Sequence, residues 1–105
     1  MKYSAYYVEE IDGAFSASIS ELELEKPPDG FVQIQVSCSS LNYKDALSAS
    51  GNKGVTRNYP FVPGIDAAGT ISDANSSNFV EGDEVLVTGY DMGMNTPGGF
   101  GEFIN

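Results

Sequence analysis

Four consecutive residues, Asn42 to Asp45, bring together an amide, a phenol, an ammonium group and a carboxylate. Side chains of these types donate hydrogen bonds and protons in reaction sites. The spacing also describes a helix start, because Asn42 suits the N-cap position and Asp45, three residues later, resembles the acid of a capping box. On spacing alone we interpret them as cap and packing. The alternative is a strand-to-helix corner that aims an amide and a phenol into a cleft.

Three other features have the composition of ligand sites. Arg57, four residues after Lys53 in a glycine-bearing loop, is either a solvated cation or an anion clamp, and spacing favours the surface. The glycines of 64–69 (GIDAAG) and 98–101 (GGFG) lack the G-x-G-x-x-G spacing of a phosphate-binding loop. We interpret the first as a strand with a tight entry and a close backbone contact, and the second as turn glycines.

Residue types that the sequence lacks exclude whole classes of catalyst. The chain has no His and one Cys, so it can build neither a Ser-His-Asp nor a Cys-His nucleophile system. A zinc site that needs His or four Cys is excluded for the same reason, and we expect no metal site. Cys38 continues the inward face of a predicted strand, where a small core residue is favoured over a reactive thiol.

The charge balance and the hydropathy pattern bear on partners and compartment. The sequence has 5 Lys and Arg against 15 Asp and Glu, a net charge of −10, so we expect no nucleic-acid partner. No apolar run approaches the roughly 20 residues that cross a bilayer, and we expect no membrane partner. A single Cys suits a reducing compartment, and we predict a cytoplasmic protein.

Short alternating stretches between Gly and Pro turns predict a mainly β fold with short helices. We expect strands over 2–8, 15–24 and 31–38, an interrupted extended segment over 61–72, and strands over 84–89 and from 101 onward. The pattern is typical of a small, partly open β-barrel forming one domain over residues 1–105. Because the sequence stops within a predicted strand, we expect a domain cut from a longer protein.

Two elements near the Asn42 cluster have predicted faces. In strand 31–38 the inward residues are Val32, Ile34, Val36 and Cys38, and the opposite face has Gln33, Gln35 and Ser37. The helix after Asn42 should be about two turns long and end at Gly51 in a left-handed conformation. Its expected inward face consists of Tyr43, Ala46, Leu47 and Ser50.

Four segments in this order resemble the N-terminal GroES-like catalytic domain of medium-chain dehydrogenase/reductases. They are SSLNYKDAL (39–47), RNYPFVPGIDAAGTI (57–71), EGDEVLVTGY (81–90) and GGFGEF (98–103). The resemblance covers residues 31–105 well and the first 30 more loosely. It is strongest to the zinc-independent quinone oxidoreductase branch, which includes acryloyl-CoA reductases. Zinc alcohol dehydrogenases have Cys where this chain has Asn42 and His-Glu where it has Ile65-Asp66, and their four-Cys lobe is missing here.

The resemblance implies metal-free hydride transfer by a longer, two-domain protein. A Rossmann domain that this chain lacks would bind NADPH, and substrate would lie in the cleft between the two domains. Hydride would reach the β-carbon of an activated alkene such as acryloyl-CoA, and a proton would reach the α-carbon. By itself the GroES-like domain is expected to be inactive, and the intact protein to be a homodimer.

The resemblance also implies roles for six residues. Tyr43 would donate a proton or a hydrogen bond to the enolate, and Asn42 would orient the nicotinamide or the substrate carbonyl. Lys44 would contact the cofactor pyrophosphate, and Arg57 a phosphate of CoA or of the cofactor. Positioning roles fall to Asp45, also the helix cap, and to Asp66.

Two other functions remain open from sequence. One is reduction of a quinone by NADPH, which needs no protonation at an α-carbon and would depend less on Tyr43. The other is a non-catalytic GroES-like β-barrel module, since this fold also occurs in chaperonin caps. The Asn-Tyr-Lys cluster favours an enzyme, whose partner would be a small molecule, an enoyl-CoA or a quinone.

Overall fold

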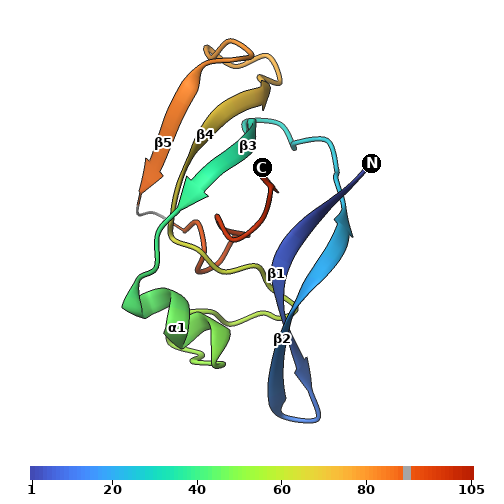
Figure 1. Ribbon diagram of the computed structural model, residues 1–105, viewed down its shortest axis with the longest axis vertical. Helices are drawn as coiled ribbons and strands as arrows, with labels where there is room; N and C mark the ends of the chain where they lie inside the picture. Colours follow the sequence, from blue (N-terminus) through green and yellow to red (C-terminus); the bar gives the residue numbers. More distant parts are fainter. Residues whose placement is uncertain (89–90) are drawn as a thin grey trace.

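The computed structural model describes residues 1–88 and 91–105, which extend over 42 × 26 × 23 Å. The prediction of a mainly β fold is confirmed, with one short helix in the described residues (Figure 1). The elements in chain order are β1 (Lys2–Ile11), β2 (Ala14–Glu23), β3 (Gln33–Ser39), α1 (Tyr43–Ala49), β4 (Asp66–Asp73), β5 (Glu84–Thr88) and β6 (Phe103–Ile104). Gly89, the last residue of the predicted strand 84–89, lies outside the described residues.

Strands β1 and β2 form a two-stranded antiparallel sheet that pairs along its whole length. The turn between them is Asp12-Gly13, and both residues have positive φ (52° and 79°), as a tight two-residue hairpin requires. Strand β1 also forms single bridges, Ala5 with Gly101 and Val8 with Phe61. These bridges join the hairpin to the segments that precede β6 and β4 in the chain.

The second sheet is antiparallel, with the strand order β5-β4-β3-β6. Its buried side chains alternate along β4, as a sheet with one core face requires. They form the core with residues of β3 and β6, namely Ile34, Ala67, Ile71 and Ile104. Gly69 lies so near β3 that a Cβ would be 2.1 Å from the carbonyl oxygen of Gln35, which confirms the predicted close backbone contact.

The predicted faces of β3 are wrong at both ends of the strand. Cys38 is exposed, whereas the alternation predicted a core position. The pairing of β3 with β4 shifts register between Val36 and Cys38, and an extra residue at such a bulge moves the later side chains to the opposite face. A second shift comes directly after Gln33, which is buried and donates a side-chain hydrogen bond to the carbonyl of Glu25 (3.2 Å).

Helix α1 has the predicted length but buries a different face. Its end is as expected, because Gly51 has φ +92° and lies against the ring of Phe15, where a Cβ would collide. Its buried side chains are Asp45 and Ser48, whereas Tyr43, predicted to face inward, is 80% exposed. The buried face is polar, so the apolar spacing pointed to the wrong side. Within the described ranges no helix is long and apolar enough to span a membrane.

Candidate functional site

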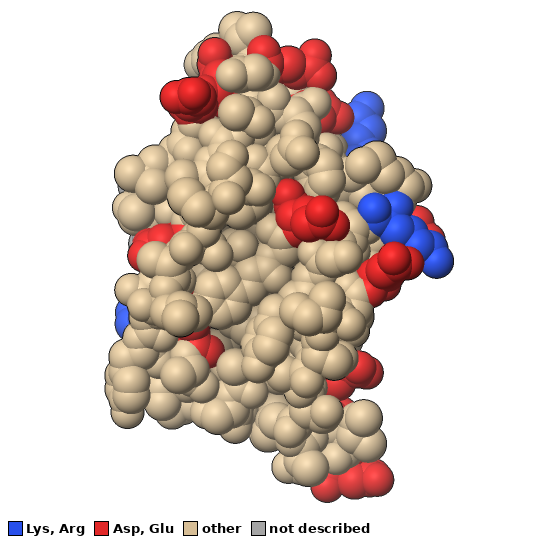
Figure 2. All heavy atoms as spheres, viewed as in Figure 1, with Lys and Arg blue, Asp and Glu red and all other residues tan. Residues whose placement is uncertain are grey.

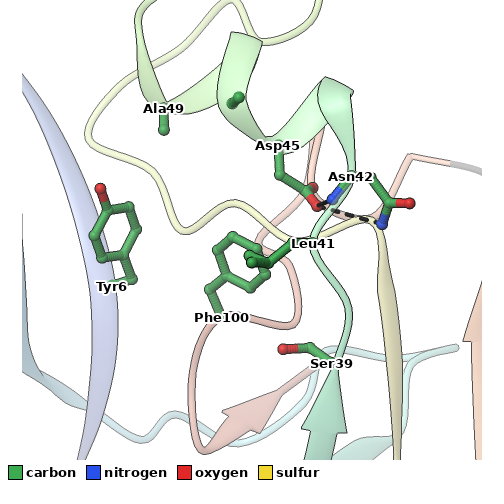
Figure 3. A pocket seen from close by; sticks show the side chains of 8 residues that line it. Tyr6, Ser39, Leu41, Asn42, Asp45, Ala49 and Phe100 are labelled. Atoms are coloured by element: carbon green, nitrogen blue, oxygen red, sulfur yellow. Dashed lines mark hydrogen bonds between the residues drawn. The ribbon is translucent and has the colours of Figure 1, made fainter.

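A cavity of about 530 Å³ lies where α1 meets β1 and the glycine-rich segment before β6 (Figure 3). Most of its wall is aliphatic or aromatic, and its polar groups come from the corner between β3 and α1. The lining residues are Tyr6, Ser39, Leu41, Asn42, Asp45, Ala46, Ala49 and Phe100. The face in Figure 2 has its charged side chains mostly at the margins, and its middle is largely uncharged.

The aromatic wall is held by main-chain contacts between distant parts of the chain. The backbone N–H of Tyr6 donates to the carbonyl of Phe100 (2.7 Å), which ties β1 to the glycine-rich segment. Their rings pack edge to face, with centroids 6.3 Å apart and planes at 77°. The phenol of Tyr6 points toward the helix near Ala49 (Figure 3). The cavity therefore has a hydroxyl on its apolar side.

Asp45 connects the start of α1 to the segment that enters β4. This carboxylate is only 2% exposed, and its Oδ2 accepts a hydrogen bond from the backbone N–H of Asn42 (2.9 Å). Its Oδ1 accepts from the backbone N–H of Ile65 (2.9 Å). A negative charge in the first helical turn is also favoured by the helix dipole. The predicted capping role of Asp45 is confirmed, and the same side chain fixes the neighbouring loop.

The side-chain amide of Asn42 lies among oxygen atoms. Its Nδ2 is 3.0 Å from Asp66 Oδ2, 3.1 Å from Ser40 Oγ and 3.4 Å from Asp45 Oδ2. Ser40 in turn donates its hydroxyl hydrogen to Asp66 Oδ2 (2.9 Å). Three of the residues predicted for the site, Asn42, Asp45 and Asp66, therefore meet in one network.

The two glycine motifs pack against each other behind this network. Gly64 has φ +115°, and a Cβ on it would lie 2.6 Å from the backbone nitrogen of Gly99. Gly99 donates to the carbonyl of Gly64 (2.9 Å), and Phe100 donates to the carbonyl of Pro63 (3.0 Å). The predicted tight entry to the strand at 64–69 is confirmed. This crossing sets where Ile65 presents its N–H to Asp45 and where Phe100 enters the cavity wall.

The other three predicted residues lie outside the cavity wall. Tyr43, Lys44 and Arg57 are all exposed, and none of them lines the cavity. Among the residues that the structure describes, the ion pair within 4.0 Å joins Lys53 to Glu10 (2.8 Å), so Lys44 and Arg57 are not committed to a carboxylate there. Their charges remain available to a ligand. The predicted catalytic role of Tyr43 stays a prediction.

Two wall residues, Tyr6 and Phe100, escaped the sequence reasoning. Tyr6 lies in a stretch with three tyrosines, KYSAYYV, whose partial alternation does not say which ring faces the helix. Phe100 stands between glycines, where the motif suggests a turn and gives no direction for the ring. Both positions depend on bridges between β1 and residues about 95 positions away, which local patterns do not encode.

The side chains at the cavity do not form a metal centre. Across residues 1–88 and 91–105, no group of three or more His, Cys, Asp or Glu is close enough to hold a metal ion. Asn42 and Ile65 are not zinc ligands by their chemistry. The site offers an apolar recess with the amide of Asn42, the carboxylate of Asp45 and the phenol of Tyr6 at its edges.

Comparison with known proteins matches residues 28–104 to the alcohol dehydrogenase GroES-like domain. The chain belongs to this family. It is 44% identical over 98 residues to the probable acrylyl-CoA reductase of Escherichia coli, a match over 93% of this chain and 30% of that protein. The chain thus spans about a third or less of the length of these relatives.

Two further relatives have solved structures. The putative quinone oxidoreductase YhfP of Bacillus subtilis is 40% identical over 88 residues, covering 84% of this chain and 27% of that one. Its crystal structure with NAD bound superposes on all of this chain with a TM-score of 0.91. An oxidoreductase from Salmonella enterica in complex with NADP gives a TM-score of 0.89 at 42% identity, over 97% of this chain and 32% of that chain.

Proposed function

We propose that this chain is the substrate-side domain, spanning residues 1–105, of an NADPH-dependent, zinc-independent reductase of activated alkenes such as acryloyl-CoA. The observation that carries the proposal is the apolar cavity beside α1, whose polar groups gather at one corner around Asn42. The 44% identity to a probable acrylyl-CoA reductase supports this substrate class. A cavity of this kind excludes water from a flat, weakly polar acyl group.

The cofactor would be bound mainly by a domain outside this chain. When bound, NADPH supplies the hydride that reduces the β-carbon of the alkene. The site fits a nicotinamide in its chemistry, because it combines an aromatic wall with the Asn42 amide. Asn42 orients the ring, and the ammonium group of Lys44 meets the pyrophosphate. The NADP-bound relative from Salmonella enterica supports NADPH as the cofactor.

The reaction also needs a donor near the substrate carbonyl and a proton for the α-carbon. We assign the donor role to the phenol of Tyr43, whose O–H group can donate a hydrogen bond or a proton. Tyr43 is exposed, so this role requires the rest of the protein to cover it. Tyr6 is the competing phenol, because its hydroxyl already lies at the cavity. Arg57 would bind a phosphate of CoA or of the cofactor.

Reduction of a quinone is the second candidate function. It is supported by the 40% identity to a putative quinone oxidoreductase and by a cavity wall that a flat aromatic ring could pack against. A quinone takes up the hydride without protonation at an α-carbon. The two functions therefore differ in how strongly they depend on a phenol donor.

The test is oxidation of NADPH by the intact, chelator-treated enzyme that contains this domain. Acryloyl-CoA and a simple quinone are offered in parallel, and we expect a strong preference for acryloyl-CoA. Preference for the quinone would transfer the function to the second candidate. Loss of activity on chelation, restored by zinc, would contradict metal independence. No oxidation with either acceptor would contradict both reductase functions.

We also propose that the intact enzyme is a cytoplasmic homodimer with small-molecule partners only. The net charge of −10 over these 105 residues opposes binding to nucleic acid and to anionic membranes. Light scattering of the purified intact protein would measure the mass in solution. A monomer or a tetramer would contradict the dimer.

A further inference from the structure

The hydrogen bonds around Asn42 determine what this side chain can offer a ligand. A primary amide has two N–H donors on nitrogen and one carbonyl acceptor. Asn42 Nδ2 lies within hydrogen-bond distance of Asp66 Oδ2 (3.0 Å), Ser40 Oγ (3.1 Å) and, more weakly, Asp45 Oδ2 (3.4 Å). The acceptors around the nitrogen thus outnumber its hydrogens, and both hydrogens are committed within the protein.

The chemistry of the neighbours fixes which end of the amide is nitrogen. Ionised Asp45 and Asp66 only accept hydrogen bonds, so a carbonyl oxygen in the same place would face two carboxylates without a proton between them. The hydroxyl hydrogen of Ser40 is directed to Asp66 Oδ2 (2.9 Å), which leaves its lone pairs for the Asn42 N–H. All three neighbours therefore favour the orientation that places the nitrogen of the amide, and not its oxygen, beside them.

The carbonyl of Asn42 is the part of the amide left for a ligand. The backbone N–H of Asp45 donates to the main-chain carbonyl of Asn42 (3.0 Å), and the side-chain oxygen of Asn42 points away from Asp45 (Figure 3). The residue is half-exposed, so a ligand can reach it. Donation to carboxylates also polarises the amide and makes its oxygen a better acceptor.

We propose that Asn42, its two N–H groups held by Asp66, Ser40 and Asp45, acts on ligands only as a hydrogen-bond acceptor. Resting on the function proposed above, its ligand group is the primary carboxamide of the nicotinamide, which carries N–H donors. The carbonyl of an enoyl thioester or a quinone is itself an acceptor and cannot bind there. This decides between the two roles that the sequence left open for Asn42.

The same network directs the substrate carbonyl elsewhere. Charge builds on the thioester oxygen as hydride arrives, and the carboxylates of Asp45 and Asp66 would repel it at the Asn42 corner. The oxygen is therefore better placed toward a phenol. Asp66 and Ser40 become positioning residues for the cofactor: they act through Asn42.

The test is the equilibrium affinity of the intact protein for NADP⁺ and for its 3-acetylpyridine analogue, measured by calorimetry without turnover. The analogue keeps the carbonyl beside the ring and replaces the NH₂ by a methyl group. Because the analogue loses one hydrogen bond, we expect the unchanged protein to bind NADP⁺ about threefold to tenfold more tightly than the analogue. Asn42→Leu should bind both nucleotides equally, and the control Asn78→Leu, in an exposed loop, should keep the preference.

Each result decides for or against the proposal. A preference that survives in Asn42→Leu would overturn it, as would a rise in the KM for the alkene with no change in nucleotide affinity. If Asn42→Leu does not fold, Asp66→Asn carries the test. This variant frees the amide to turn, so the preference should fall, and an unchanged preference would contradict the network. No binding of either nucleotide to the unchanged protein would overturn the proposed function as well.

Discussion

The two ends of α1 each carry a polar cluster, and the clusters differ in whether a ligand can reach them. At the C-terminal end, Ser48 Oγ and Thr56 Oγ1 lie 2.6 Å apart, and the hydroxyl of Tyr59 donates to the carbonyl of Ser48 (2.5 Å). Ser48 is 0% and Thr56 1% exposed. We call this the C-terminal cluster. It is closed, and each hydroxyl has its partner inside the protein.

The N-terminal cluster consists of Ser40, Asn42, Asp45 and Asp66. It also satisfies its donors internally, but two of its members, Asn42 and Asp45, border the cavity. It holds two carboxylates and no cation within ion-pair distance among the described residues. The two carboxylates repel each other, and hydrogen bonds from the backbone N–H groups of Asn42 and Ile65 to Asp45, and from Ser40 and Asn42 to Asp66, offset that repulsion.

The comparison separates positions whose change affects stability from those whose change affects ligand binding. Substitutions in the C-terminal cluster should lower stability and leave nucleotide affinity unchanged. Substitutions in the N-terminal cluster should alter affinity, and only Asp45 should alter both.

Asp45→Asn should have the largest effect, because one oxygen that accepts a backbone N–H becomes an NH₂ group. We expect a loss of about 2 kcal/mol in the free energy of unfolding, measured by urea denaturation of the intact protein. Nucleotide affinity should fall too, since the Asn42 backbone loses its anchor. Asp29→Asn, at an exposed turn, is the control; equal stability of the two variants would contradict the bridging role of Asp45.

Tyr43→Phe should lower turnover by more than about tenfold with little change in stability, because it removes a donor from an exposed ring. Tyr6→Phe keeps the packing against Phe100 and should cost less than about threefold. Steady-state kinetics with the preferred acceptor measures both. The reverse order would move the donor role from Tyr43 to Tyr6.

Thr56→Val should destabilise the protein by about 1–2 kcal/mol, because Ser48 Oγ loses its partner in a fully buried site. Adding Ser48→Ala should recover part of that loss, since neither hydroxyl is then left unsatisfied. Affinity for NADP⁺ should be unchanged in both variants. A clear drop in that affinity would mean that the C-terminal cluster also supports the ligand site.

The smallest effects are expected at two lysines. Lys53→Met removes a partly exposed ion pair with Glu10 and the contacts of its ammonium group with the rings of Phe15 and Tyr59 (5.4 and 5.0 Å). It should cost less than about 1 kcal/mol, and less still in high salt. Lys44→Met should leave stability unchanged and weaken nucleotide binding. Equal effects of the two changes on binding would refute the assignment of Lys44.

Sequence patterns predicted the parts of the site that are local. Asn42 and Asp45 have the spacing of a helix cap. The glycines at 64–69 and 98–101 lack the spacing of a phosphate-binding loop. Each interpretation needed only residues that are close together in the sequence. The buried face of α1 was missed because hydrophobic periodicity cannot identify a face that buries Asp45 and Ser48.

Features that depend on residues distant in the sequence could not be predicted, because local patterns do not encode which segments pair. The exposure of Cys38 results from a register shift against β4, and a shift in pairing leaves no mark on the alternation within β3. Tyr6 reaches the cavity because β1 pairs with the segment before β6. The contact between Asp66 and Asn42 likewise forms only when the sheet has folded.

A crystal structure of the intact protein with NADP⁺ and propionyl-CoA, the saturated product of acryloyl-CoA reduction, tests the central claim most directly. The account predicts the nicotinamide at the N-terminal cluster, with Asn42 Oδ1 accepting a hydrogen bond from the carboxamide, and the acyl group in the apolar cavity. A ligand carbonyl bonded to Asn42 Nδ2, or a nicotinamide away from this corner, would contradict it.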